Sequence, residues 1–303
     1  MTTAILTETE LSQLPSTQAL RTQLDRDGFV LIPAAFKQEQ LEPLRAAAGH
    51  ITSLARCGKW PHLRTLPKQF PPWASDARNG IWGVQHLLHP AMPSQAIFAT
   101  SYFGDAIVGP ATQLLECAED DLVMELYNLL VRPDRDFALR WHRDDVPPQA
   151  SAAEESARLN EPAWHAQWNL ALFDDASLVV VPGSHRRPRT DAERSADPFA
   201  ERLPGMKVVE MAAGDLVFYD NNVLHRGVYS SGTERMTLHG SVGHVKGSKA
   251  RARNVLQHGV GEWVGECDFS GLPERIRARA EGMRQRLFEM GRASGDVGFS
   301  HTD

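Results

Sequence analysis

The feature that most restricts the fold is a series of short segments with strand character between residues 122 and 244. They are rich in β-branched and aromatic residues, and turns or polar loops separate them. The segments are Leu122–Val131, Asp136–Asp144, His165–Phe173, Ser177–Val181, Lys207–Met211, Leu216–Tyr219 and Arg235–His244. Because no helical pattern alternates with them, the series predicts an antiparallel barrel or sandwich rather than a parallel α/β sheet.

Helices are expected on both sides of this strand-rich region. Apolar residues at steps of three and four mark one helix face near the N-terminus, at Leu41, Leu44, Ala48, Ile51 and Leu54. A second apolar stripe runs from Ile276 to Met290, where Pro273 is placed to start a helix and Gly291 to stop it. We expect this helix to pack on the sheet rather than to form a dimer seam, because stable coiled coils need more heptads.

The 303 residues are predicted to form one domain, since no repeat or low-complexity linker divides the chain. Residues 1–120 would be a mainly helical N-terminal part, 121–245 the β-core and 246–303 a C-terminal helical part. Two long polar loops, Val146–Pro162 and Arg186–Gly205, interrupt the predicted strands. Loops of such length in a compact domain are usually functional lids or disordered segments, and the first is the candidate lid over a site.

Composition narrows the partners and the metal chemistry. With 32 basic and 38 acidic residues, the charge gives no reason to expect nucleic acid or an anionic membrane as a partner. Three cysteines without a CxxC pair fit a reducing compartment, and no signal or membrane-spanning pattern is visible. We therefore expect a cytoplasmic protein, a monomer or a homodimer. Twelve histidines direct any metal chemistry toward nitrogen and oxygen ligands.

A histidine and a carboxylate stand two residues apart at the end of one predicted strand. Residues two apart on a strand point to the same face, with Cα atoms roughly 6.5–7 Å apart. His142 and Asp144 can therefore converge on one metal ion. The spacing alone is weak evidence, because the C-terminal tail repeats it at His301-Thr302-Asp303.

Two later residues make the metal interpretation more specific. His225 follows a predicted strand and a polar turn, and Arg235 opens another strand ten residues later. Two histidines and one carboxylate form a facial triad that leaves three positions of iron(II) open. An arginine can bind a carboxylate through two parallel hydrogen bonds. The set meets the needs of 2-oxoglutarate, which chelates iron through its keto acid and requires a cation for its distal carboxylate.

With these motifs in this order, residues 20–245 resemble the phytanoyl-CoA dioxygenase (PhyH) family of iron(II)- and 2-oxoglutarate-dependent oxygenases. Besides His225 and Arg235, the matching motifs are Asp27-Gly28-Phe29-Val30-Leu31-Ile32-Pro33, Trp141-His142-Arg143-Asp144, Val181-Pro182-Gly183-Ser184-His185 and Gly214-Asp215-Leu216-Val217-Phe218-Tyr219.

The resemblance implies a mainly β fold with flanking helices, whose core is a double-stranded β-helix, the cupin-like jelly roll. It also implies an iron(II) ion held by His142, Asp144 and His225, and 2-oxoglutarate whose C5 carboxylate is held by Arg235. Dioxygen would be the second cosubstrate, and ascorbate is a candidate reductant.

The reaction implied is oxidation of an unactivated C–H bond of a small molecule, in natural-product or other specialised metabolism. Halogenases of the broader group carry a small residue in place of the carboxylate, so Asp144 favours hydroxylation, desaturation or oxidative cyclisation. Three alternatives stay open. They are an acyl-CoA hydroxylase of the phytanoyl-CoA type, a non-catalytic jelly-roll protein that binds metal and 2-oxoglutarate, and a cupin-type metal protein with no use for Arg235.

Two further residues are predicted to bind the cosubstrate. Thr237 shares strand parity with Arg235, so its hydroxyl can face the same interior. Gln167 lies on an otherwise apolar predicted strand, where a polar side chain needs a partner.

Three residues are predicted to contact the prime substrate. Arg140 shares strand parity with His142 and would bind a carboxylate of substrate or cosubstrate, the alternative being a salt bridge within the barrel. Tyr127 and its neighbour Asn128 face opposite ways, so at most one of them lines the site. Trp82 belongs to the N-terminal region from which the family partly builds its substrate pocket.

Overall fold

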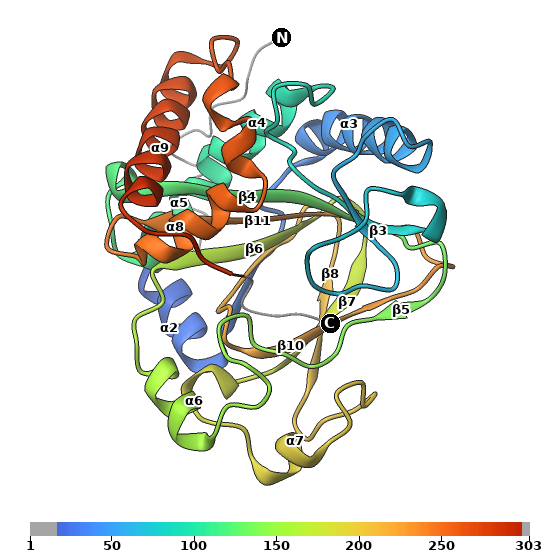
Figure 1. Ribbon diagram of the computed structural model, residues 1–303, viewed down its shortest axis with the longest axis vertical. Helices are drawn as coiled ribbons and strands as arrows, with labels where there is room; N and C mark the ends of the chain where they lie inside the picture. The colour runs from blue at the N-terminus through green and yellow to red at the C-terminus, as the bar shows by residue number, and fades with distance from the viewer. Residues whose placement is uncertain (1–16, 299–303) are drawn as a thin grey trace.

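Two antiparallel β-sheets face one another in the computed structural model, which describes residues 17–298 (Figure 1). The tail motif at residues 301–303 lies outside this range. One sheet has the strand order β1-β9-β6-β11-β4-β3-β2 and the other the order β5-β10-β7-β8. The strands are β1 (Phe29–Ile32), β2 (Leu63–Thr65), β3 (Ile81–Val84), β4 (Leu122–Val131), β5 (Phe137–Ala138), β6 (His165–Ala171), β7 (Asp175–Val181), β8 (Lys207–Met211), β9 (Leu216–Tyr219), β10 (Leu224–Tyr229) and β11 (Met236–His244). The arrangement is a cupin-like jelly roll, so the predicted fold class is confirmed.

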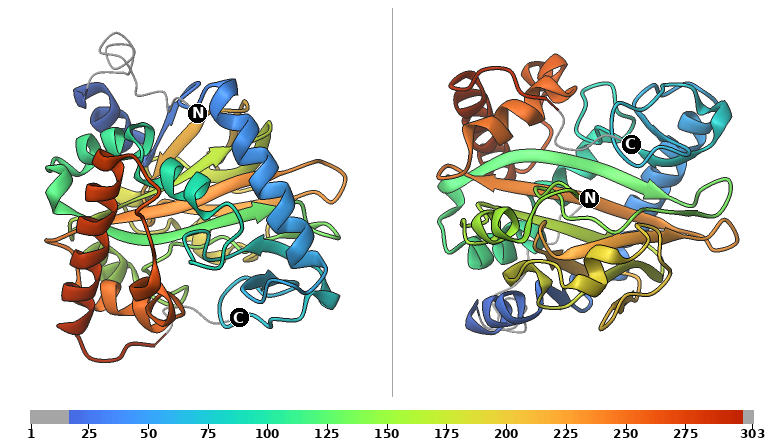
Figure 2. Two further views of the ribbon diagram at one scale, coloured as in Figure 1. Left: turned by 90° about the horizontal axis from the view of Figure 1, so that it is seen from above. Right: turned by 60° about the horizontal axis from the view of Figure 1, so that its bottom comes forward.

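Helices cover the outer face of the larger sheet (Figures 1 and 2). The α-helices of the described residues are α2 (Thr17–Asp27), α3 (Gln38–Arg56), α4 (Gln95–Phe103), α5 (Asp105–Leu115), α6 (Ala152–Leu159), α7 (Asp191–Ser195), α8 (Lys249–Gln257) and α9 (Glu274–Arg292). The largest hydrophobic cluster lies between this layer and the sheet. Helix α9 packs against β4 and α8 through Ala280, Met283 and Leu287, all fully buried, which confirms its predicted packing on the sheet.

Smaller apolar clusters fill the ends of the space between the two sheets. One joins side chains of β1, β6, β7, β8 and β9, including Val180 and Val217. Another joins Leu66, Trp82, Leu130, Leu139 and Tyr229. Polar side chains of β6, β10 and β11 occupy the middle, and this is where the candidate site lies.

One predicted strand is largely wrong. The segment Asp136–Asp144 is a regular strand only at Phe137–Ala138, because the N–H of Trp141 donates to the carbonyl of Pro198, which belongs to no strand. The chain then returns to β10 at His142. β10 itself is absent from the predicted strands, since His225, Arg226 and Gly227 interrupt its apolar pattern.

Both long loops contain a short helix that the prediction missed. Loop 146–162 carries α6 and loop 186–205 carries α7. Each helix begins with a capping box, Ser151 with Glu154 and Thr190 with Glu193. The spacing Ser/Thr-x-x-Glu is a visible start signal, so the sequence did contain the information.

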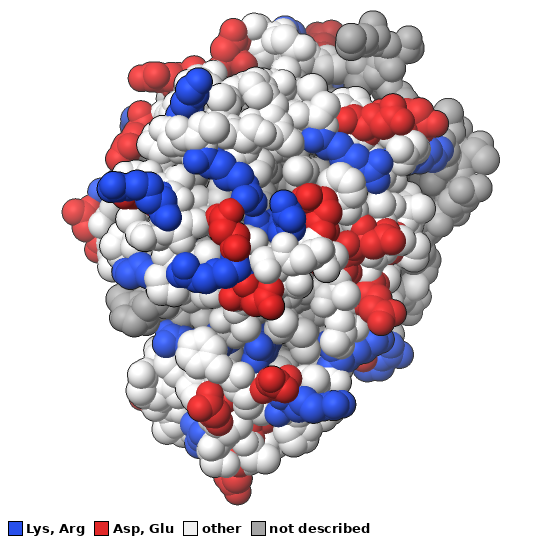
Figure 3. Space-filling model, turned by 90° about the vertical axis from the view of Figure 1, so that its right-hand side faces the viewer, with Lys and Arg blue, Asp and Glu red and all other residues white. Residues whose placement is uncertain are grey.

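None of the described helices combines the length and the apolar character that crossing a bilayer requires. On the face shown in Figure 3, basic and acidic side chains are interspersed rather than gathered by sign.

Candidate metal centre

The two histidines of the predicted triad face each other across an antiparallel backbone pair. The N–H of His142 donates to the carbonyl of His225, and the N–H of His225 donates to the carbonyl of His142, both over 3.0 Å. Their ring centroids are 4.3 Å apart. The N–H of Asp144 then donates to the carbonyl of Asn221 over 2.8 Å. Backbone pairing along one end of β10 thus brings the two distant motifs together.

The three side chains converge on one point. Oδ1 of Asp144 lies 3.4 Å from Nε2 of His142 and 3.8 Å from Nε2 of His225. One potential ligand atom from each residue lies within 4.8 Å of the others. This is the one predicted set of metal-ligating residues, and the structure assembles it.

Backbone carbonyls orient both imidazoles. Nδ1 of His142 lies 2.9 Å from the carbonyl of Arg140, and Nδ1 of His225 lies 2.8 Å from the carbonyl of Val223. The amide nitrogen of Gln69 is also 3.2 Å from Nδ1 of His142, but the carbonyl is closer and only accepts. Each Nδ1 therefore carries a proton, and Nε2, the atom that faces Asp144, is the nitrogen of each ring available to a metal ion.

Protonation states in the site also suit a metal ion. Burial alone would raise the pKa of Asp144, but the hydrogen bond from His142 and the charges of the two imidazoles hold it well below its usual range. Burial, and then the like charge of His142, lowers the pKa of His225 to about 4. At neutral pH the carboxylate is therefore ionised and the His225 ring is neutral, the forms that bind metals.

Arg143, which lies between the two predicted ligands, links two neighbouring turns through hydrogen bonds. This role was not predicted from the sequence. The buried guanidinium of Arg143 donates to the carbonyls of Ser184 and Asn222 over 2.7 and 2.6 Å, and to that of Arg187 over 3.1 Å. The hydroxyl of Ser184 in turn accepts from the N–H of Leu224 over 2.7 Å. The Pro-Gly-Ser-His motif thereby holds the start of β10 in place.

Gln167 lies beside Asp144, and its role in binding the cosubstrate stays a prediction. Its side-chain amide donates a hydrogen bond of 3.0 Å to Oδ2 of Asp144, whereas the two histidines lie near Oδ1. On the same strand, the side chain of Asn169 lies 2.9 Å from Nδ1 of His239. Burial, and then the charge of Arg64, lowers the pKa of His239 to about 3, so that this ring is neutral.

Arg235 and Thr237 are brought together by an aspartate that the sequence analysis did not single out. Nε of Arg235 lies 3.3 Å from Oδ2 of Asp175, and the hydroxyl of Thr237 donates to the same oxygen over 2.6 Å. Burial would raise the pKa of Asp175, but Arg235 and nearby hydroxyl groups lower it. In the sequence, Asp175 lies directly before the apolar run Ser177–Val181, and this position could have indicated a carboxylate at the start of a buried strand. The Arg235 guanidinium also lies 4.2 Å from the ring centre of Tyr229.

Arg140, His142 and Asp144 share one side of their segment, as strand parity predicts. All three are half-buried, while the two residues between them are buried on the other side. The guanidinium of Arg140 lies 4.8 Å from the ring centre of Phe70, and this ring meets that of His142 edge to face. Arg140 therefore stands at the edge of the metal centre.

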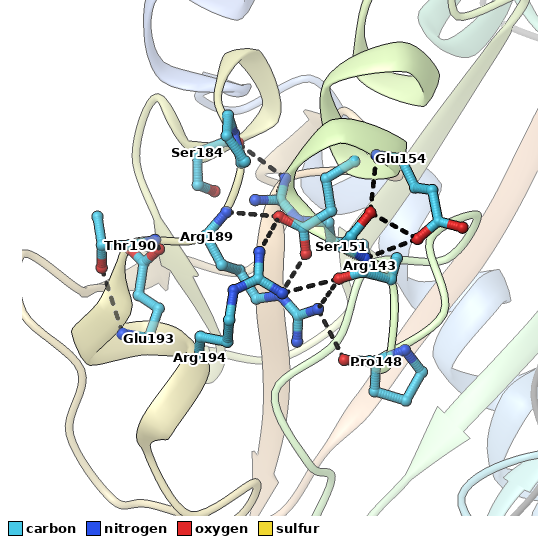
Figure 4. A network of polar contacts seen from close by, with 12 residues as sticks. Arg143, Pro148, Ser151, Glu154, Ser184, Arg189, Thr190, Glu193 and Arg194 are labelled. Carbon is cyan, nitrogen blue, oxygen red and sulfur yellow. Dashed lines mark hydrogen bonds and ion pairs between the residues drawn. The ribbon is translucent and has the colours of Figure 1, made fainter.

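The two long loops close over a small pocket beside His142 and form its outer wall with Val146, Pro148, Glu155 and Arg189. Glu155 of α6 is fully buried, and its carboxylate accepts from Arg189 and from Arg194, which belong to the other loop. Figure 4 shows the two arginines side by side.

Tyr127 is not part of the site, so this prediction is wrong. Its hydroxyl lies 2.6 Å from that of Ser101, and its ring contacts Phe98 and Trp168 in the core beneath the helices. β4 is buried on both faces, and Tyr127 lies on the helix side. Trp82 is buried between the sheets, where its ring is stacked at 5.9 Å on that of Tyr229.

Comparison with known proteins then decides the family. The sequence profile of the phytanoyl-CoA dioxygenase (PhyH) family matches residues 24–236. The chain belongs to this family. It is accordingly a non-haem iron(II)- and 2-oxoglutarate-dependent dioxygenase, as the resemblance implied. A search of curated protein sequences finds no match.

Solved PhyH-type structures share the fold at low sequence identity. AviO1 from Streptomyces viridochromogenes Tue57 is 21% identical, with a TM-score of 0.54 over 75% of this chain and 95% of that one. EctD from S. alaskensis, solved with 2-oxoglutarate and 5-hydroxyectoine, is 19% identical, with a TM-score of 0.55 over 77% of each chain. HygX from Streptomyces hygroscopicus, solved with nickel and 2-oxoglutarate, is 16% identical, with a TM-score of 0.52 over 80% and 88%.

Proposed function

We propose that His142, Asp144 and His225 hold the iron(II) of this oxygenase, and that Arg235 receives the distal carboxylate of 2-oxoglutarate. The observation that carries the proposal is the convergence of Nε2 of both histidines on an ionised carboxylate oxygen. The two imidazoles and one carboxylate would leave three positions of the metal open. We treat the chain as one oxygenase domain over residues 1–303.

The bound iron and 2-oxoglutarate would supply the activation of dioxygen and the oxidising power. The protein's own residues supply geometry. The carbonyls of Arg140 and Val223 fix the imidazole tautomers, and Gln167 holds the outer oxygen of Asp144. The loops joined by Glu155 would exclude water from the reacting substrate. A carboxylate at position 144 leaves no vacant ligand place for a halide, which favours hydroxylation, desaturation or cyclisation.

The prime substrate would be a small molecule of specialised metabolism. EctD was solved with 5-hydroxyectoine, and SnoN, a similar structure at 17% identity, is an epimerase from nogalamycin biosynthesis. Arg140 and Trp82 remain the proposed substrate contacts, while Thr237 and Gln167 remain proposed contacts of the cosubstrate. We propose a cytoplasmic enzyme, monomeric or homodimeric, without a nucleic-acid or membrane partner.

Succinate release tests the assignment of the metal ligands. Purified protein with iron(II), 2-oxoglutarate and ascorbate should release succinate, and the rate should rise when amino acids, acyl-CoAs or cyclic scaffolds include a true substrate. Asp144→Ala should abolish the stimulated release and weaken nickel binding, while Asp120→Ala, an exposed surface change, should alter neither. Full activity of Asp144→Ala would refute the triad. Binding of iron and 2-oxoglutarate without succinate would instead favour the non-catalytic alternative.

A further inference from the structure

A second arginine, Arg64, enters the space between the sheets from β2. It is the strand partner of Gly83 on β3. A Cβ atom at position 83 would lie 2.9 Å from Cδ of Arg64 and 3.2 Å from its Cγ. The arginine stem therefore lies over bare glycine backbone, and any side chain at position 83 would displace it. Only a glycine leaves this path open.

Two indole rings receive the Arg64 guanidinium. Its central carbon lies 5.2 Å from the ring centre of Trp73 and 5.1 Å from that of Trp82. Trp82 is stacked on Tyr229, and the guanidinium of Arg235 lies over the Tyr229 ring. A row of Arg64, Trp82, Tyr229 and Arg235 thus links the new arginine to the proposed 2-oxoglutarate subsite.

Arg64 forms no ion pair with an acidic residue among residues 17–298. Its Nε is buried and makes no hydrogen bond there. Arg251 and Arg279, by contrast, are paired with carboxylates, and Arg235 is paired with Asp175. Burial lowers the pKa of Arg64 to about 10, against the opposing influence of Tyr229, so the group is still charged at neutral pH.

Arg64 is the arginine between the sheets without an ion pair of its own. Asp175 pairs with Arg235, while the charge of Asp144 acts on Arg64 only from the metal centre. Once a metal ion binds Asp144, the half-buried guanidinium is left without a carboxylate to balance it. Aromatic faces can stack on a guanidinium while its in-plane N–H groups stay free for a carboxylate. The place of Arg64 is thus poor for stability and suited to an anion.

We propose that Arg64 binds a carboxylate of an organic acid held between the two sheets. This inference rests on the proposed function. Two sources share the chemistry. One is the distal carboxylate of 2-oxoglutarate, shared with Arg235, and the other is a carboxylate of the prime substrate.

Calorimetric titration of the nickel-loaded protein with N-oxalylglycine, a dicarboxylate analogue of 2-oxoglutarate, tests the first source. Arg64→Gln should weaken binding roughly 10- to 100-fold, the loss expected for one charge-assisted contact. Arg64→Lys should weaken it less. Arg78→Gln, which removes an exposed arginine paired with Asp76, is the matched control and should change nothing.

If the substrate is the source, N-oxalylglycine should bind Arg64→Gln normally. A panel of carboxylic acids, added to wild-type protein saturated with nickel and N-oxalylglycine, should then contain members that raise the melting temperature. Arg64→Gln should abolish that shift. A variant that matches the wild type in both experiments overturns the proposal. Wild-type protein that binds neither nickel nor N-oxalylglycine would instead refute the proposed function. The carboxylic acids would then be added to the ligand-free wild type and to Arg64→Gln, and the difference in their melting shifts would test Arg64 alone.

The melting temperature of the ligand-free protein separates binding from a structural role. Because Arg64 is half-buried and no ion pair is lost with it, Arg64→Gln should melt at the same temperature as the wild type or higher. A clearly lower melting temperature with unchanged ligand binding would show that the arginine only supports the fold, and would overturn the proposal.

Discussion

Replacing Glu155 by alanine should open the two loops over the pocket without unfolding the barrel. The Glu155 side chain is fully buried, while the side chains of Arg189 and Arg194 are 13% and 32% exposed. Removing one partner of a buried ion pair costs about 3–5 kcal/mol. The exposure of Arg194 and its remaining bond to the Ala150 carbonyl place the expected loss near the lower limit, about 3 kcal/mol.

The loss should stay local, because α6 is too short to persist without its tertiary contacts. A loss of about 3 kcal/mol raises the open fraction roughly 100-fold. Hydrogen exchange followed by mass spectrometry should show faster exchange in peptides covering 146–162 and 184–195, with the β-strands unchanged. Glu161→Ala, which removes an exposed carboxylate from the same loop, is the control. Equal exchange in the two variants would refute the reasoning.

Three further predictions concern stability and metal binding. Tyr127→Phe should lower the free energy of unfolding by about 1 kcal/mol in urea titrations and leave N-oxalylglycine binding intact; weaker binding would return Tyr127 to the site. Gln167→Leu frees the outer oxygen of Asp144 and should weaken nickel binding by roughly tenfold in calorimetry, and unchanged affinity would contradict its orienting role. Burial lowers the pKa of His86 to about 3. Below pH 6.5 the unfolded chain therefore binds a proton that the folded protein does not bind, and the stability of the fold decreases as the pH is lowered. His86→Asn, which tolerates the positive φ there, should lose about 2 kcal/mol less than the wild type between pH 7 and pH 5, and parallel pH profiles would count against this linkage.

The order of motifs and the apolar strand patterns predicted most of the fold and the centre of the site. The strands β4, β8 and β9 begin and end at the residues that their apolar runs predicted. The prediction of a regular strand at 136–144 was wrong because part of this segment pairs with the backbone of a loop. No local pattern reveals such a partner far away in the sequence. The side chains of this segment nevertheless point alternately to its two sides. The prediction that His142 and Asp144 lie on the same side is therefore correct although the segment is not a regular strand.

Two other misses have a physical explanation. Strand parity shows which residues share a face, but not which face looks inward when both are buried, and this misled the prediction for Tyr127. Asp175 and Arg64 act through tertiary contacts with Arg235 and the two indoles. Gly83 was the visible sign of Arg64, since a glycine inside an apolar strand often marks a close approach, but the sequence does not say of what.

The reciprocal backbone bonds between His142 and His225 have a consequence for how this enzyme can change over time. The spacing of the two imidazoles depends on peptide groups, which every residue possesses, and not on the identity of the long excursion between them. The two loops 146–162 and 186–205 within that excursion can change in length or sequence while both imidazoles stay where they are. The pocket wall can therefore diversify toward new substrates while the metal centre is kept, and chimaeras that exchange these two loops between relatives are a direct way to redirect the chemistry.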